Sequence, residues 1–381
     1  MKNLWRCISP LLPDVSGAMA VFAASPALVV ALDSRMGLAR SRGGMGTPGA
    51  QADVQVVNLP ELDYAIGDEA AFLARVEQLH VQGNERRAGS AQRLFELVVL
   101  LGAPVSALTG IDVQRLARAL QERLGVPVLG IETTGNRSYD KGIAQAYEAL
   151  LALAAGGVET CPGAVNVLGC TVLDLPGSAV HGQLLAGLQA DGMAAVSDAG
   201  YTDSLTQWRQ LRAAERNIVT TGAALPLARR LQAECDIPFT RIDELPCFDE
   251  WAAGLSVVGC GKVLVFGEQV QGMLLRRLLR RMGARQVDVA TFATCDKVLR
   301  GPGDRKLSSD TELAELVRDG GYASVIGDAT LAPLVPAPAR LVPLAWPAVQ
   351  PELAYDATEL TPAWLAWAAG QLACGGKAGK W

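Results

Sequence analysis

Short apolar runs alternate with amphipathic segments along the whole chain. In the first third, the apolar runs 27–32, 54–57 and 95–101 are each followed by polar or glycine-bearing turns, which is typical of buried parallel strands. Between them, segments 69–79 and 113–124 repeat apolar residues at three- and four-residue spacing and predict helices. The same succession restarts near Ala164 and again near Lys262. The pattern predicts an α/β protein with three Rossmann-like, doubly wound parallel-sheet domains.

Clusters of glycine and proline near residues 156–163 and 254–261 mark the expected domain boundaries. We expect a first domain at 1–158, a second at 159–257 and a third at 258–345. The proline-rich run 333–351 predicts a crossing linker. Residues 346–381 are expected to form a tail that packs back on the body, through a short helix at 361–373 whose Trp364 and Trp367 face the core.

Composition and charge narrow the class of function. The 381 residues are 50% hydrophobic and include 40 glycines, which excludes a disordered chain, and the net charge of -5 offers no basic field for nucleic acid or an anionic membrane. No apolar stretch is long enough for a membrane helix, and Pro10, Pro13 and Asp14 interrupt the opening apolar segment, so we expect no signal peptide. Eight cysteines without a C-x-x-C pair favour a cytoplasmic protein with free thiols. Three of them, Cys170, Cys235 and Cys260, lie in or beside apolar signals and are expected to be buried structural thiols.

Candidate chemistry is sought where the predicted strands end, because ligands of open parallel sheets collect there. Asp33 and Arg35 follow the first strand, and the polar segment ETTGNRSYD supplies Glu132, Tyr139 and Asp140 after a later one. Two interpretations of that segment stay open, a capped turn or part of a site.

Two further features are expected to be structural. The segment GEQVQG at 267–272 has two glycines between a strand and a helix, but it lacks G-x-G-x-x-G and its glutamate would repel a diphosphate, so we expect a plain turn and no bound nucleotide. His80 and His181 are the only histidines, and we expect each at a surface or helix end rather than as a general base.

Several segments in order resemble the nitrogenase component 1 family, whose members include the two nitrogenase subunits, their cofactor-assembly scaffolds and the dark-operative chlorophyll-type reductases. The resemblance spans nearly the whole chain. It rests on Cys7-Ile-Ser-Pro, LPELDYAIGDEAAFLARVEQL from Leu59, LLGAPVSALTGIDVQRLARAL from Leu100, VPVLGIETTG, AAERNIVTTGAALPLARRLQAECDIPF and KVLVFGEQVQGMLLRRLLRRMGA.

The resemblance implies an interface iron–sulfur cluster held by three cysteines from the first domain of each subunit. Only Cys7 is present here. The second cysteine would stand near Leu38 and the third near Pro104, and Thr221 occupies the approximate place of the cysteine that binds the catalytic cofactor in nitrogenase. One thiolate is an incomplete ligand set for a cubane.

The resemblance with these departures implies a divergent nitrogenase-like oxidoreductase subunit, and we do not expect dinitrogen reduction itself. In this hypothesis the chain contributes Cys7 to a cluster shared with a homologous partner subunit, or with a second copy, and an ATP-dependent iron-protein reductase supplies electrons. Asp33, Arg35, Glu132, Tyr139 and Asp140 would then line the substrate cavity. The alternative is a metal-free structural partner or cofactor-assembly scaffold. A periplasmic-type ligand-binding protein is disfavoured because no export signal is expected.

Overall fold

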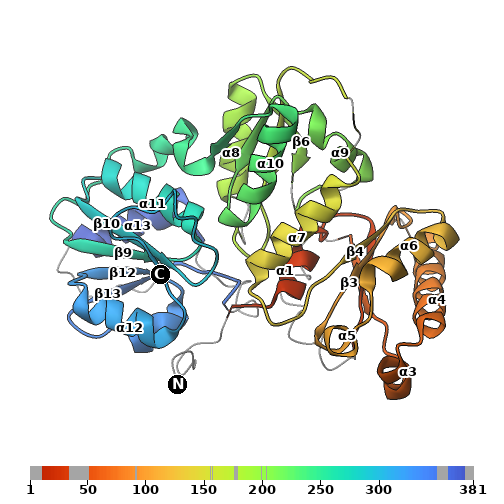
Figure 1. Cartoon of the computed structure of the whole chain (residues 1–381). Coiled ribbons are helices and arrows are strands. Elements are labelled where there is room, and N and C mark those ends of the chain that lie inside the picture. The colour runs from red at the N-terminus through yellow and green to blue at the C-terminus, as the bar shows by residue number, and fades with distance from the viewer. Residues whose placement is uncertain are drawn as a thin grey trace.

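The computed structural model describes residues 11–33, 51–90, 92–154, 156, 158–175, 179–198, 200–202, 204–349 and 359–373. Three separate parallel sheets follow one another along the chain, and Figure 1 shows them as three lobes around a shared centre. The prediction of an α/β chain with several parallel, doubly wound sheets is confirmed.

The first sheet has the order β2-β1-β3-β4 and the second has the order β6-β5-β7-β8. Every pairing in them is parallel. The strands of the first sheet are β1 (Ala27–Ala31), β2 (Asp53–Val56), β3 (Leu97–Leu101) and β4 (Val128–Ile131). Those of the second are β5 (Ala164–Leu168), β6 (Ala194–Asp198), β7 (Arg216–Val219) and β8 (Phe239–Arg241).

The third sheet has the order β11-β10-β9-β12-β13 and is also parallel throughout. Its strands are β9 (Lys262–Phe266), β10 (Gln286–Thr291), β11 (Arg305–Lys306), β12 (Ser324–Gly327) and β13 (Arg340–Pro343). Strand β13 corrects the expectation that 333–351 is only a linker. Leu341 and Val342 pair with β12, and Pro343 is tolerated because β13 is an edge strand.

Helices are present where they were predicted at 69–79, 113–124 and 361–373, and the structure adds others. They are α1 (Asp14–Val21), α3 (Glu61–Ile66), α4 (Glu69–Ala88), α5 (Pro104–Thr109), α6 (Val113–Leu124), α7 (Tyr139–Leu151), α8 (Ala179–Ala190), α9 (Leu205–Arg209), α10 (Leu225–Cys235), α11 (Gln269–Arg281), α12 (Asp310–Asp319) and α13 (Pro362–Ala373). Asp112 caps α6 by accepting from the Arg115 amide, and Gly125 ends it with φ +68°, so this helix has the predicted bounds.

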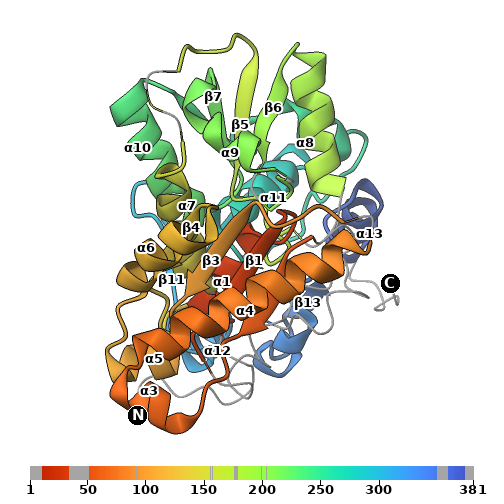
Figure 2. The same cartoon turned by 90° about the vertical axis from the view of Figure 1, so that its right-hand side faces the viewer.

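Two helices differ from the expectation for a physical reason. Helix α4 continues from Leu79 to Ala88, and Figure 2 shows it lying along one face of the first sheet. Its last turns are polar in sequence, yet Gly83 and Arg87 are buried there: the Phe95 ring lies 2.4 Å from where a Gly83 Cβ would stand. Helix α11 begins inside the GEQVQG segment rather than after it, because Glu268 acts as its N-cap.

Helices α1 and α7 form the centre of the molecule, and Figure 1 shows them where the three lobes meet. A Cβ on Gly17 would lie 1.8 Å from the Tyr139 carbonyl oxygen, and one on Gly142 would lie 1.7 Å from that of Asp14. Glycine at both positions is therefore what lets the two helix backbones touch. One buried core cluster runs through residues of all three sheets, including Val29, Leu168 and Leu264.

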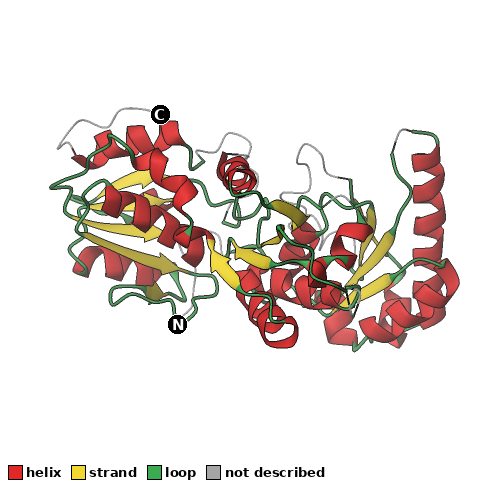
Figure 3. Cartoon of the chain, turned by 90° about the horizontal axis from the view of Figure 1, so that it is seen from above, coloured by secondary structure: helices red, strands yellow, loops and turns green. Residues whose placement is uncertain are grey.

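The view from above in Figure 3 shows the first and third lobes spread to either side of this centre. Helix α13 belongs to the third lobe, where the fully buried Trp364 donates its indole N–H to the Pro343 carbonyl at 2.8 Å. Among the described helices, none combines the length and the apolar character that crossing a membrane requires.

Candidate functional site

The polar segment after β4 is organised by a carboxylate from α1. Asp14 is fully buried, and its carboxylate accepts hydrogen bonds from the backbone amides of Gly135 at 2.7 Å and Thr134 at 3.0 Å and from Arg137 Nε at 3.2 Å. Residues 134–137 therefore form a capped turn, the first of the two interpretations left open by the sequence. Glu132 at its start is exposed, and the structure does not bring its side chain to the buried centre.

The other candidates of the first sheet are scattered. Asp33 is buried just after β1, where its carbonyl accepts a 2.6 Å hydrogen bond from the Tyr64 hydroxyl, away from α7. Pro104 is exposed at the start of α5. Cys7, Arg35 and the position near Leu38 lie outside the described residues.

Tyr139 and Asp140, at the start of α7, are the two predicted residues that reach the centre. The Tyr139 hydroxyl donates to Asp174 Oδ1, which also accepts from Trp346 Nε1 at 3.2 Å. Tyr139 and Trp346 meet edge to face with ring centroids 6.4 Å apart. Asp140 Oδ2 accepts from the amide and hydroxyl of Thr294. Residues that follow strands of the second and third sheets thus converge on one helix from the first.

Glu268, the N-cap of α11, completes this group. Its Oε1 accepts from the Gly222 amide at 2.7 Å and its Oε2 from the Gln271 amide at 2.9 Å. GEQVQG is therefore not only the turn that was expected, because its last four residues begin α11 and its glutamate side chain occupies the N-terminus of that helix.

A cavity of about 60 Å³ opens beside these groups. Its lining includes Asp174, Glu268 and Gln271, together with Leu344, Trp346 and Glu359. This volume accommodates a few water molecules or a very small substrate. No described cysteine or histidine lines it.

Burial shifts the acid–base behaviour of the two carboxyl groups. Desolvation raises the pKa of Asp174 from 3.8 to about 7, against the hydrogen bonds from Tyr139 and Trp346. Desolvation, with the nearby Asp174 charge as the next cause, raises the pKa of Glu268 from 4.5 to about 8. The two carboxyls interact, so their titration belongs to the pair. The same burial raises the pKa of Tyr139 well above its ordinary value. At neutral pH the pair holds a proton beside the cavity.

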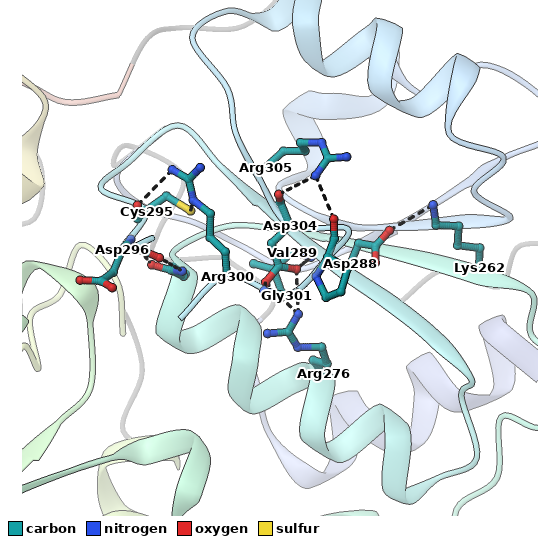
Figure 4. Close-up of polar contacts among 12 residues, drawn as sticks. Lys262, Arg276, Asp288, Val289, Cys295, Asp296, Arg300, Gly301, Asp304 and Arg305 are labelled. Atoms are coloured by element: carbon teal, nitrogen blue, oxygen red, sulfur yellow. Dashed lines mark hydrogen bonds and ion pairs between the residues drawn. The ribbon is translucent and has the colours of Figure 1, made fainter. Parts of the chain in front are cut away.

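The loop after β10 is anchored by Asp304. Asp304 accepts two hydrogen bonds from Arg276, at 2.7 and 2.9 Å, and others from the amides of Val289 and Gly301. Figure 4 shows this network together with the nearby contact from Arg300 Nε to Cys295 Sγ at 3.1 Å. The same loop carries Thr294, which hydrogen-bonds to Asp140.

Sequence inspection missed Asp174, Trp346 and the role of Glu268. Position just after a strand, the criterion used for the first sheet, could have found them. Asp174 follows β5, Glu268 follows β9 and Trp346 follows β13. The sequence also gave no sign that Asp14 caps a turn 120 residues away.

Residues 90–259 match the family described as "Nitrogenase component 1 type Oxidoreductase". The resemblance to the nitrogenase component 1 family is therefore confirmed, with the family match covering these residues. Its structure is similar to that described as "Nitrogenase Cp1 at pH 6.5", with a TM-score of 0.70, 12% identity, and 98% of this chain and 94% of that one covered. The structure described as "Nitrogenase Cp1 at pH 5" gives a TM-score of 0.68 at 12% identity, with 98% and 89% covered. No curated protein matches the chain significantly.

The described residues at this centre do not fit a sulfur-bound metal cofactor. Thr221 is fully buried and its hydroxyl contacts the Gly169 carbonyl at 3.4 Å. The cavity offers carboxylate oxygens and an amide, which suit proton transfer rather than the thiolate ligation of an iron–sulfur group. At the first sheet, the exposed Pro104 supplies no ligand either.

Proposed function

We propose that this nitrogenase component 1-like chain is an oxidoreductase subunit whose redox centre lies outside its own core, in an iron–sulfur cluster shared with a partner subunit. The observation that carries the proposal is the small cavity at the centre, whose lining includes protonatable carboxyls and no described thiol or imidazole. Such a cluster supplies single electrons when bound. Cys7 is the ligand that we propose this chain contributes.

The chain's own central residues would hold protons. Asp174 and Glu268, with pKa values of about 7 and 8, keep a proton at neutral pH. Tyr139 and Trp346 fix Asp174 from two sides. A reduction that consumes protons as well as electrons needs a donor of this kind near its substrate.

The further parts of the proposal follow from the family. We propose a homologous subunit or a second copy as partner, an ATP-dependent iron protein as electron donor, and a cytoplasmic location. The division into domains at 1–158, 159–257 and 258–345, with the tail at 346–381, also remains a proposal. Of the predicted cavity residues, we retain Tyr139 and Asp140 for the centre and leave Asp33, Arg35 and Glu132 as candidates for the first lobe.

Anaerobic co-purification with the proteins encoded beside it, followed by iron analysis and electron paramagnetic resonance, tests the proposal. The isolated chain should be nearly iron-free, and the complex should contain iron that Cys7→Ala lowers. Cys161→Ala, which removes an exposed thiol, is the matched control and should leave the iron content unchanged. Stoichiometric iron in the isolated chain would contradict the proposal.

The second candidate is a metal-free structural partner or assembly scaffold. The observation that favours it is the absence of a cysteine from the segment around the exposed Pro104, near which the resemblance places the family's third cysteine. An iron-free complex whose composition and activity do not respond to Cys7→Ala would establish this role instead.

A further inference from the structure

A second group of chemically active side chains lies at the carboxyl end of the second sheet. Cys170 follows β5, His181 is in the first turn of α8, and Asp198 is the last residue of β6. A ligand atom of each, the thiol sulfur, a ring nitrogen and a carboxylate oxygen, lies within 4.8 Å of the other two. None of the three lines the central cavity.

The surrounding residues hold these groups in place. The His181 ring stacks on Tyr201 with centroids 4.0 Å apart and planes 9° from parallel, and its Nε2 lies 2.5 Å from Asp198 Oδ2. The Asp198 amide donates to the Thr202 hydroxyl at 2.9 Å, and that hydroxyl donates to the Asp198 carbonyl. Orientation of ligands by such contacts is common around protein metal ions.

One buried oxygen of the group has no hydrogen-bond partner. Asp198 Oδ1 is buried and has no hydrogen-bond partner, and Cys170 is fully buried. Desolvation raises the pKa of the Cys170 thiol, and the neighbouring Asp198 and Asp174 charges raise it further. A divalent cation would neutralise one thiolate and one carboxylate together and would give the orphaned oxygen a partner.

We propose that Cys170, His181 and Asp198 bind one zinc-like divalent ion, with water as the fourth ligand. Sulfur, imidazole nitrogen and carboxylate oxygen are the three ligand types that zinc uses. Ligand atoms of a tetrahedral zinc are separated by roughly 3.3–3.6 Å, given bonds of about 2.0–2.3 Å. Binding therefore requires the His181 to Asp198 contact to open by about one ångström. Binding also releases the thiol proton of Cys170, since the thiolate is the ligand.

The test is a titration of the chelator-stripped, reduced full chain with Zn²⁺ in competition with a chromophoric chelator. We expect one tight site per chain, with release of about one proton when the pH is above neutral. We expect Zn²⁺ affinity to fall by about 100-fold or more in each of the variants Cys170→Ser, His181→Ala and Asp198→Asn. This loss is larger than that caused by removing a residue that only orients a ligand. The matched controls are Cys260→Ser, which removes another buried thiol, and His80→Ala, which removes the other histidine; both should bind like the parent.

Co²⁺ provides a second measurement on the unmutated chain, so the result does not depend on a variant that folds. A bound Co²⁺ with a thiolate-to-metal charge-transfer band, displaced by Zn²⁺, supports the site. Absence of a tight site in the parent chain, or equal loss in the ligand and control variants, overturns the proposal. Both outcomes are independent of the iron content of the complex and thus of the proposed redox role.

Discussion

Two buried carboxyl groups, those of Asp14 and Asp174, lie near the N-terminus of α7. They differ in the hydrogen-bond donors and charges around them. Asp14 is buried with amide donors and an arginine around its carboxylate, so its charge is compensated. Asp174 is buried with both of its donors on Oδ1, while Oδ2 has no partner, and another carboxyl, Glu268, is nearby. The two buried carboxyls therefore differ in the donors and countercharge that surround them, which together with desolvation govern a carboxyl's pKa.

The largest expected effect distinguishes the two sites by pH. Because the folded-state pKa values of Asp174 and Glu268 are raised to about 7 and 8, their contribution to folding is fully present below their ordinary values near 4 and is lost as the pH rises through 7 to 8. The free energy of unfolding, measured with urea at pH 6 and pH 9, should therefore fall by several kcal/mol between the two.

Glu268→Gln should reduce this fall, since the amide does not titrate. Glu122→Gln, at an exposed position of α6, should leave it unchanged. Equal unfolding free energies at the two pH values in the parent chain would show that the pair is not a proton-holding site.

The next largest effect is expected at Asp14. Asp14→Ala should lower the free energy of unfolding by about 3 kcal/mol, because the amides of Thr134 and Gly135 lose their acceptor. Arg137→Ala removes only a half-exposed partner of the same carboxylate and should cost less than about 1 kcal/mol. Urea denaturation of both variants gives the comparison, and equal costs would contradict it.

The contact between α1 and α7 joins the two sites. Gly142→Ala forces a methyl group against the Asp14 carbonyl and should cost about 2 kcal/mol, because neither backbone can move aside cheaply. Gly182→Ala, in α8 with open space around the new methyl group, should be neutral or stabilising by up to about 1 kcal/mol. The melting temperatures of the two variants measure the difference; a neutral Gly142→Ala would mean that the helices are less closely packed.

The smallest effect concerns Asp140, which lies between the two sites. Thr294→Val removes the hydroxyl donor to Asp140 and should destabilise the fold by about 1 kcal/mol, whereas Thr294→Ser keeps it and should cost less. Chemical denaturation at one pH is sufficient, and a valine variant as stable as the serine variant would show that the hydroxyl contributes nothing.

Much of the fold was accessible from local pattern. The strands β1, β3 and β9 and the helix α6 were predicted because their apolar periodicity extends over the whole element. Strand β13 was missed because prolines surround its short apolar core, and the end of α4 was missed because its buried positions are glycine and arginine.

The sequence by itself determined the α/β class and the family resemblance, since both depend on short-range periodicity and ordered motifs. Only the tertiary structure decided which carboxyl groups are buried together at the centre. Tyr139, Asp174 and Trp346 are separated by 35 and 172 positions, and their contacts exist only because three sheets meet at α7. The same applies to Cys170, His181 and Asp198, which come from three elements of the second lobe. Desolvation depends on what surrounds a group in space, and chain order does not encode it locally.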